Sequence, residues 1–354
     1  MRDSTPGQLS LFADAAGVDP AEITAATRGL AAALPATIRL GTSSWSFPGW
    51  TGIVYATHNG RPATEQDLAR HGLRAYAAHP LLRTVSLDRT FYAPLTAVEF
   101  TRYAGQVPPD FRFVVKAPAA FTDPVIRRPG SGEPARDNPS FLDAAAAAVA
   151  FVRPAASGLG AKAGPLVFQF PPLGRRLLAD VPQLIARLGA FAAALPRIAM
   201  LAFEVRDPEL AVPDFAAAIG AAGVVPCLAV HARMPPVAEQ AAAFGLDRAD
   251  SPWPVIARWN LHAGHDYAGA KARYAPFDRL VDEDQPTRAA LAGLAMGAAA
   301  AGRETFITIN NKAEGSAPLS VVALAARIAT LDVRTPSGEH PGPLLDRGRI
   351  PSSS

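Results

Sequence analysis

The sequence is poor in cysteine and in charge, and both shortages limit what the protein can be. The 354 residues contain one cysteine, Cys227, which excludes an internal disulfide framework and a zinc site built on several thiolates. It favours a reducing, cytoplasmic location. Charged residues make up 18% of the chain and the net charge is +3, so charge alone points to neither a nucleic acid nor a membrane. With 49% hydrophobic residues, the chain is expected to bury a large core.

Several familiar motifs are also missing. No Gly-x-Gly-x-x-Gly follows the first predicted strand, and the chain has no Gly-x-Ser-x-Gly elbow and no Walker loop, which argues against a dinucleotide fold, a serine hydrolase of the usual type and an NTPase. The N-terminus lacks the apolar stretch of a signal peptide, and the alanine-rich tracts are interrupted before they reach about 20 residues. We therefore expect a soluble protein that does not span a membrane.

Short apolar runs alternate along the chain with segments of helical composition. The predicted buried strands are 38–41, 84–87, 111–116, 165–170, 198–204, 224–230, 255–259 and 305–310. The predicted helices between them are 65–77, 96–106, 140–152, 181–195, 213–222, 237–244, 286–301 and 319–328. Eight strand–helix units in order predict an α/β fold, a TIM-like (β/α)8 barrel. An open doubly wound sheet is the alternative.

The barrel is predicted over residues 36–332, between an N-terminal extension (1–35) and a tail (333–354) that is rich in Pro, Gly and Ser and expected to pack poorly. The extension is predicted to contain a helix over Asp19–Leu34, with Asp19 as its N-cap and Pro20 in its first turn. The segment Ala117–Asn138 is too long for an ordinary connection. It is expected to be either a lid or binding loop above the barrel rim, or a mobile surface insertion.

Polar and cationic residues lie where the predicted strands end, and in a barrel these ends converge on one mouth. The candidates for catalysis are Glu204 as acid or base, with Lys116 and Arg206 stabilising charge. On this hypothesis Glu204→Gln abolishes turnover and preserves folding. The candidates for substrate binding are Trp45, Asp88, Tyr92, Gln169, Arg258, Asn310 and Asn311. The alternative is structural: Glu204 pairs with Arg206, and the rim cations, including Lys312, pair with Asp88, Asp123, Asp207 or Glu204.

Other side chains are ambiguous. Trp45, Tyr92 and Trp259 could stack on a base or sugar, although core packing is the better expectation for any one of them. His262 and His265 precede Asp266 with a spacing that could hold a metal, but solvated loop histidines are the default. His231 is a candidate for proton transfer, and Gln169 needs a partner within the protein or in a ligand. The sequence identifies no metal site and no cofactor.

Several short segments of the sequence resemble those of a known family. They are Ile38–Phe47 (IRLGTSSWSF), Thr90–Tyr92 (TFY), Phe113–Pro118 (FVVKAP), Gly164–Pro172 (GPLVFQFPP), Phe203–Arg206 (FEVR) and Asn310-Asn311. In this order they resemble the DUF72 family, also called YecE-like, from about Ile38 to Ile328. The resemblance implies a TIM-like barrel with one polar rim pocket, and no established activity. The chain departs from the family pattern where Asp123 and Asp207 replace histidines and Lys312 replaces an aspartate.

Three functional hypotheses are compatible with these residues. The first is an enzyme that hydrolyses a phosphate-bearing substrate, such as a phosphoester of a nucleic acid or nucleotide, in the cationic pocket. The second is an isomerase or lyase acting on a sugar or sugar phosphate. The third is an adaptor that binds nucleic acid or protein without catalysis.

A short peptide near the N-terminus suggests a protein partner. Gln8, Leu9, Leu11 and Phe12 lie in a polar segment, and they are similar to the Gln-Leu-(Ser/Asp)-Leu-Phe peptides that bind the bacterial sliding clamp. Two apolar anchors on an extended segment suit a hydrophobic cleft. The alternative is that these residues cover the barrel itself.

Overall fold

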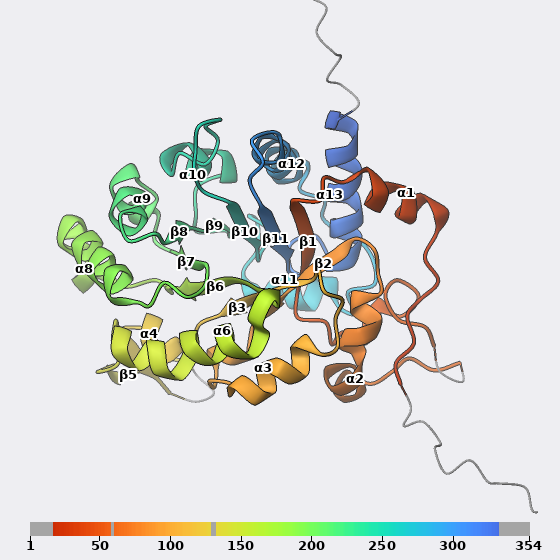
Figure 1. Ribbon diagram of the computed structural model, residues 1–354, viewed down its shortest axis with the longest axis horizontal. Helices are drawn as coiled ribbons and strands as arrows, with labels where there is room; N and C mark the ends of the chain where they lie inside the picture. Colours follow the sequence, from red (N-terminus) through yellow and green to blue (C-terminus); the bar gives the residue numbers. More distant parts are fainter. Residues whose placement is uncertain (1–16, 58–59, 129–131, 333–354) are drawn as a thin grey trace, which may run out of the picture.

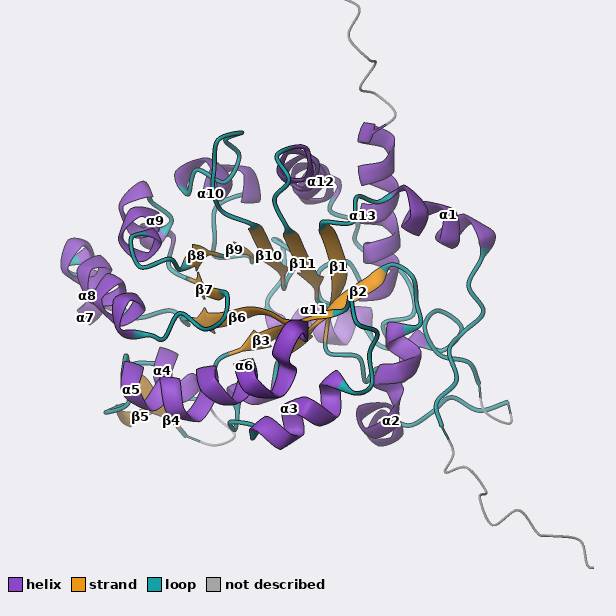
Figure 2. Ribbon diagram, viewed as in Figure 1, coloured by secondary structure: helices purple, strands orange, loops and turns teal. Residues whose placement is uncertain are grey.

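The computed structural model describes residues 17–57, 60–128 and 132–332. Its centre is a ring of parallel strands (Figures 1 and 2). In chain order these are β1 (Ile38–Ser43), β2 (Leu82–Leu87), β3 (Arg112–Lys116), β6 (Ala163–Gln169), β7 (Leu201–Glu204), β8 (Val225–Pro226), β9 (Leu228–Val230), β10 (Val255–Trp259) and β11 (Thr305–Ile309). Neighbours follow the order β8-β7-β6-β3-β2-β1-β11-β10-β9. Strands such as β1, β10 and β11 are buried throughout, because a parallel sheet is covered on both faces.

The two end strands of this sheet, β8 and β9, are separated by Cys227 alone. The Cys227 N–H donates to the Phe203 carbonyl of β7 at 2.8 Å, and β9 pairs with β10. A single strand, interrupted at one residue, therefore joins the two ends of the sheet, and eight strand segments form the ring. This confirms the predicted TIM-like barrel and excludes an open doubly wound sheet.

Helices cover the outside of the ring (Figure 2). They include α2 (Glu65–Ala77), α3 (Ala97–Ala104), α5 (Ala144–Ala147), α6 (Arg153–Leu159), α7 (Arg175–Leu178), α8 (Val181–Ala194), α9 (Pro213–Gly220), α10 (Val237–Ala243), α12 (Gln285–Ala300) and α13 (Ala317–Asp332). Helix α11 (Tyr267–Tyr274) follows β10 and lies instead near the strand ends (Figure 2). Most of the predicted helices are found within a few residues of their expected bounds. The predicted helix 140–152 is displaced along the chain, because α5, a π-helical turn over Ala148–Val152 and α6 continue it to Leu159.

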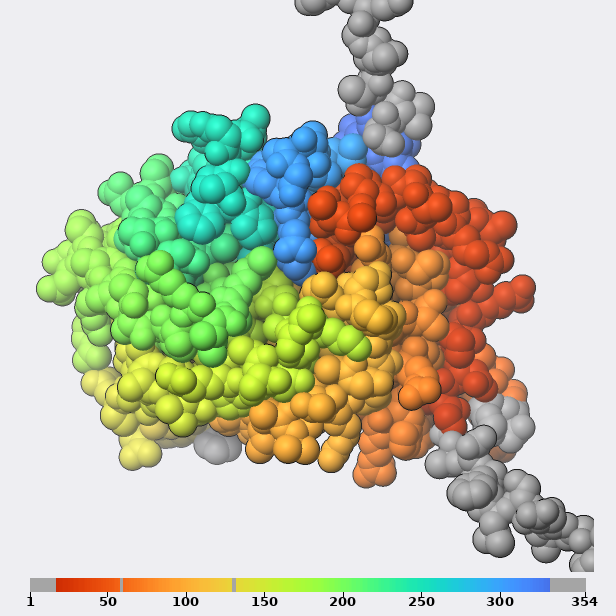
Figure 3. All heavy atoms as spheres, in the orientation of Figure 1, coloured from red at the N-terminus to blue at the C-terminus, as the bar shows by residue number. Residues whose placement is uncertain are grey.

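The N-terminal helix begins later than the sequence predicted. Helix α1 spans Ala25–Ala33, and its N-cap is Thr24, whose hydroxyl accepts from the Thr27 N–H. Asp19 is not a cap: its carbonyl accepts from the Ala56 N–H at 2.9 Å, so the chain there is extended and paired with the loop after β1. These backbone bonds replace those of a first helical turn. Helix α1 then packs beside α13, so a red segment near the start of the described chain lies next to the blue segment near its end (Figure 3).

The long segment 117–138 carries its own secondary structure in its described part. It forms α4 (Ala119–Thr122) and an antiparallel hairpin of β4 (Val125–Arg127) and β5 (Pro134–Asp137). The Asn138 side chain ties its end to its start by donating to the carbonyls of Ala120 and Asp123. Its described residues are thus held as a hairpin and are not an irregular loop.

One helical stretch of the described chain, Ala144–Lys162, is long and apolar enough to cross a membrane by length and composition alone. The sequence interpretation did not anticipate it. Its buried side chains, including Phe151 and Val152, belong to the barrel's hydrophobic core. Gly158 approaches α3 so closely that a Cβ there would lie 2.3 Å from the Ala97 carbonyl oxygen. These contacts are those of a helix packed in a folded domain.

Candidate ligand-binding site at the barrel rim

The strand ends meet around one cavity of about 390 Å³. Lys116 and Gln169 are the last residues of β3 and β6, while Asp88, His231 and Asn310 each come one residue after a strand. The parallel arrangement therefore brings residues that are distant in sequence to one mouth. The cavity is lined by Asp88, Phe91, Tyr92, Lys116, Gln169, Pro171, Pro172, Arg206, His231, Arg258, Asn260, Leu261, Tyr267 and Asn310.

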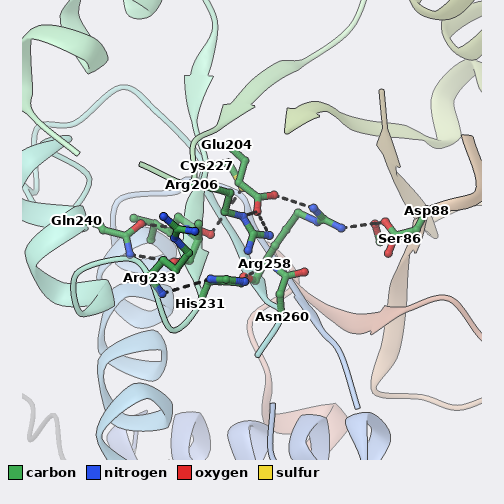
Figure 4. Close-up of polar contacts among 12 residues, drawn as sticks. Ser86, Asp88, Glu204, Arg206, Cys227, His231, Arg233, Gln240, Arg258 and Asn260 are labelled. Atoms are coloured by element: carbon green, nitrogen blue, oxygen red, sulfur yellow. Dashed lines mark hydrogen bonds and ion pairs between the residues drawn. The ribbon is translucent and has the colours of Figure 1, made fainter. Parts of the chain in front are cut away.

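A chain of charged groups forms the floor of this cavity (Figure 4). Glu204, at the end of β7, is fully buried and accepts from Arg206 Nε at 2.8 Å and from Arg258 Nη1 at 2.7 Å. Arg258 Nη2 donates to Asp88 Oδ1 at 2.8 Å, and the Ser86 hydroxyl donates to the same oxygen at 2.7 Å. Both oxygens of Glu204 are therefore occupied, each by a guanidinium.

These neighbours set the protonation of Glu204. Burial alone would raise its pKa, but the charges of Arg206 and Arg258 outweigh burial and hold the pKa below its ordinary value. The carboxylate is thus ionised, enclosed and fully engaged. The structure places Glu204 beneath the cavity as the anchor of two arginines, and the structural ion pair that the sequence left as an alternative is the arrangement observed.

Lys116 differs from the two arginines because it forms no hydrogen bond or ion pair through its side chain with any described residue. Its Nζ lies 3.5 Å from the centre of the Phe91 ring, a cation–π contact. Burial, and after it the charge of Arg258, lowers the pKa of Lys116 to about 8. Lys116 thus lines the cavity, and its ammonium has no hydrogen-bonded carboxylate among the described residues.

His231 contributes a second titratable group to the cavity wall. Its Nδ1 accepts from the Arg233 backbone N–H at 3.3 Å, so the proton of the neutral ring lies on Nε2. Burial and the charge of Arg206 lower the pKa of His231 to about 4. At neutral pH the ring is uncharged and has one N–H group available as a donor.

The remaining predicted site residues divide into two groups. Asp88, Tyr92, Gln169, Arg206, Arg258 and Asn310 line the cavity together with Lys116. No described residue is a hydrogen-bond partner of the Gln169 amide, so the partner that the sequence required would be a ligand or water.

Trp45 and Asn311 do not line this cavity. The Trp45 ring is buried, and its Nε1 donates to the Leu68 carbonyl at 3.0 Å. Asn311 Oδ1 accepts from Trp50 Nε1 and from the Ala317 N–H, which ties a loop to a helix start. Trp259 is fully buried in β10. These three side chains are held by the fold and are not positioned to stack on a ligand here.

The acidic and histidine residues considered in the sequence have other partners. Asp123 binds Arg127, and Asp207 accepts from the Leu173 N–H, so neither neutralises the rim cations. His265 pairs with Asp282 at 3.1 Å. Among the described residues no group of three or more His, Cys, Asp or Glu side chains could hold a metal ion. The described part of the insertion 117–138 does not line the cavity.

Sequence reasoning missed Tyr267, which lines the cavity from the first turn of α11. No helix was predicted there, because residues 267–274 have a mixed polar composition without a clear apolar face. Only the folded position of α11, above the end of β10, reveals this residue.

Fold and site together define an α/β barrel protein with one cationic cavity at the carboxyl rim. The family model described as "Protein of unknown function DUF72" matches residues 39–342, and the chain belongs to this family. A DUF72 family protein from Enterococcus faecalis has a similar structure, with 18% identity and a TM-score of 0.55 over 82% of this chain and 95% of that one. A DUF72 family protein from Thermotoga maritima gives 18% identity and a TM-score of 0.53 over 83% and 99%. These likenesses show the fold. No curated protein matches the chain.

Proposed function

We propose that the rim cavity binds the phosphate group of a substrate and that Lys116 is the group that receives it. The observation that carries this proposal is the unpaired ammonium of Lys116, beside arginines already held by Glu204 and Asp88. Three cations and two carboxylates at this site leave an excess of one positive charge. An anion of the substrate can neutralise it, with Gln169 and His231 Nε2 donating hydrogen bonds.

The reaction we propose is hydrolysis of a phosphoester. In this scheme water attacks phosphorus as the bond from phosphorus to the leaving oxygen breaks. Lys116, protonated at neutral pH, stabilises the developing charge, donates its proton to the leaving oxygen and regains a proton from the attacking water. Glu204 does not serve as acid or base in this scheme, because both its oxygens bind guanidinium groups and no part of it is exposed. It positions Arg206 and Arg258 instead.

Isomerisation of a sugar phosphate is a second candidate, favoured by the pKa of about 8 for Lys116. A lysine with this pKa has a free-base fraction near neutral pH that can abstract a proton next to a carbonyl. The two reactions differ in their products. Release of inorganic phosphate from a phosphoester supports hydrolysis, whereas incorporation of solvent deuterium into a phosphosugar without phosphate release supports isomerisation.

The affinity for a phosphomonoester is expected to fall about tenfold between pH 7.5 and 9.5, because Lys116 loses its charge as the pH rises through about 8. Calorimetric titration with ribose 5-phosphate measures this, since its phosphate is already a dianion in this range. Lys116→Arg, which stays charged, should show a flat profile. If the wild type binds ribose 5-phosphate with an affinity that does not depend on pH, Lys116 is not the group that receives the phosphate. If it does not bind this compound at all, the proposed phosphate site is wrong.

The peptide containing Gln8, Leu9, Leu11 and Phe12 lies outside the described residues. We propose that it recruits the protein to a sliding clamp, which implies the cytoplasmic location that the single cysteine favours. Deleting residues 1–16 is expected to abolish binding to the clamp and to leave the affinity of ribose 5-phosphate unchanged. Surface plasmon resonance on immobilised clamp tests the first result. Equal clamp binding by both forms would contradict the recruitment.

A further inference from the structure

A second cavity, of about 510 Å³, adjoins the first at the same rim. The two cavities share three lining residues, Asp88, Tyr267 and Asn310. The second is bounded by the loop after β1, which contributes Phe47, and by the loop after α11, which contributes Phe277. The two cavities are therefore neighbours, and a ligand that occupied both would pass Tyr267.

Two loops that pack tightly against each other form part of the wall of the second cavity. The rings of Phe47 and Phe277 meet edge to face, with centroids 5.8 Å apart. A Cβ on Gly49 would lie 1.8 Å from the Pro276 carbonyl oxygen, so only glycine allows the loops to approach so closely. Ser44 and Phe277, which both line the cavity, have φ values of 64° and 74°. Left-handed backbone at non-glycine residues is costly and persists where the surrounding structure holds it.

The lining chemistry of the second cavity differs from that of the first. It is lined by two lysines, Lys271 and Lys312, and by two carboxylates, Glu65 and Asp88, of which Asp88 is already bound by Arg258 of the first cavity. Lys312 is further engaged by the Tyr267 ring, 4.0 Å away, and by Asn310 Oδ1 at 3.2 Å. Aromatic and proline surfaces with a few hydrogen-bonding groups remain, which suits a flat heteroaromatic ring.

We propose that the second cavity holds the base of a nucleotide whose phosphate lies in the first cavity. This inference rests on the proposed phosphate site and specifies its substrate class as a nucleoside monophosphate unit, either free or at the end of a nucleic-acid strand. The rings of Phe47 and Phe277 contact the base, and Tyr267 stands beside the sugar between the two cavities.

The test is a comparison of affinities measured by calorimetry for ribose 5-phosphate, for each of the four nucleoside 5′-monophosphates and for a 5′-phosphorylated tetranucleotide. We expect at least one nucleotide to bind about tenfold or more tightly than ribose 5-phosphate. Phe277→Ala and the more conservative Phe47→Leu should abolish this preference while ribose 5-phosphate binds as before. Phe141→Leu, at a half-buried phenylalanine that lines neither cavity, is the matched control and should retain the preference.

The outcomes separate this inference from the proposed function. If ribose 5-phosphate binds as tightly as every nucleotide, or if the preference survives both substitutions in folded protein, the base site is wrong and the phosphate site stands. If no phosphate compound binds, both are wrong. If the tetranucleotide binds more tightly than the mononucleotides, the ligand is the end of a nucleic-acid strand. If the affinities are equal, the ligand is a free nucleotide.

Discussion

Glu204→Gln is expected to lower the free energy of unfolding by about 3–5 kcal/mol, because it leaves buried guanidinium charge without its carboxylate. Glu204 is fully buried and bridges Arg206 and Arg258. A glutamine has the same shape, but its amide NH₂ would point a donor at one of the guanidinium groups. Urea denaturation followed by circular dichroism measures the change. The sequence alone favoured a folded, inactive variant, whereas the structure predicts a weakened fold.

The control for this prediction is Glu314→Gln, because Glu314 is also fully buried and accepts from Arg288 at 2.6 Å. It lines neither rim cavity. Both variants should lose stability, but only Glu204→Gln should also lose phosphate affinity, since it releases the arginines of the cavity floor. The double variant Glu204→Gln/Arg258→Met should recover part of the lost stability. If Glu204→Gln had the same urea midpoint of unfolding as the wild type, the ion pairs of Glu204 would contribute little to the stability of the fold.

Lys116→Met is expected to have opposite effects on stability and on binding. The low pKa of Lys116 means that its charge is costly in the empty cavity, so methionine should stabilise the unliganded protein by about 1–3 kcal/mol. Affinity for ribose 5-phosphate should fall about tenfold or more, because the substitution removes a cation of the cavity lining that has no hydrogen-bonded partner among the described residues. Urea denaturation without ligand and calorimetric titration measure the two effects.

Arg70→Met serves as the matched control. Arg70 is exposed on α2 and does not line the cavity, so this substitution removes one positive charge away from the proposed site. It should change neither quantity by a comparable amount. A Lys116→Met protein that is less stable than the wild type would mean that the ammonium is satisfied in the fold. Unchanged affinity would mean that the phosphate binds elsewhere.

The fold could be predicted from the sequence because parallel strands covered on both faces produce uninterrupted apolar runs. The segment 224–230 was predicted as one strand, and the structure shows it as β8 and β9 on either side of Cys227. The rim residues followed from the same pattern, since each strand end places its next polar side chain at the mouth. This is why Lys116, Gln169 and Arg258 were found without coordinates.

Partnerships between side chains could not be predicted, because they depend on atoms brought together by the whole fold. From the sequence, Lys116, Arg206 and Arg258 were all candidate cations of the rim. Only the distances between their nitrogens and the carboxylate oxygens of the fold distinguish the unpaired lysine from the paired arginines. Trp45 matched the family pattern as well as Tyr92 did, yet only Tyr92 lines the cavity. The second cavity depends on the meeting of loops some 230 residues apart, 44–49 and 276–277, for which the local sequence contains no signal.

The order of strands also determines when the protein can fold during its synthesis. β1 pairs with β11, the last strand of the ring, and Arg39 of β1 binds Glu304 just before β11. A nascent chain that has not yet released β11 from the ribosome has unpaired backbone groups along β1 and β10, and these edges are open to association with other chains. Completion of the ring waits for its most distant contact, which makes folding slow relative to local helix formation. The interval between the synthesis of β10 and the release of β11 is therefore the period in which this polypeptide depends most on protection from aggregation.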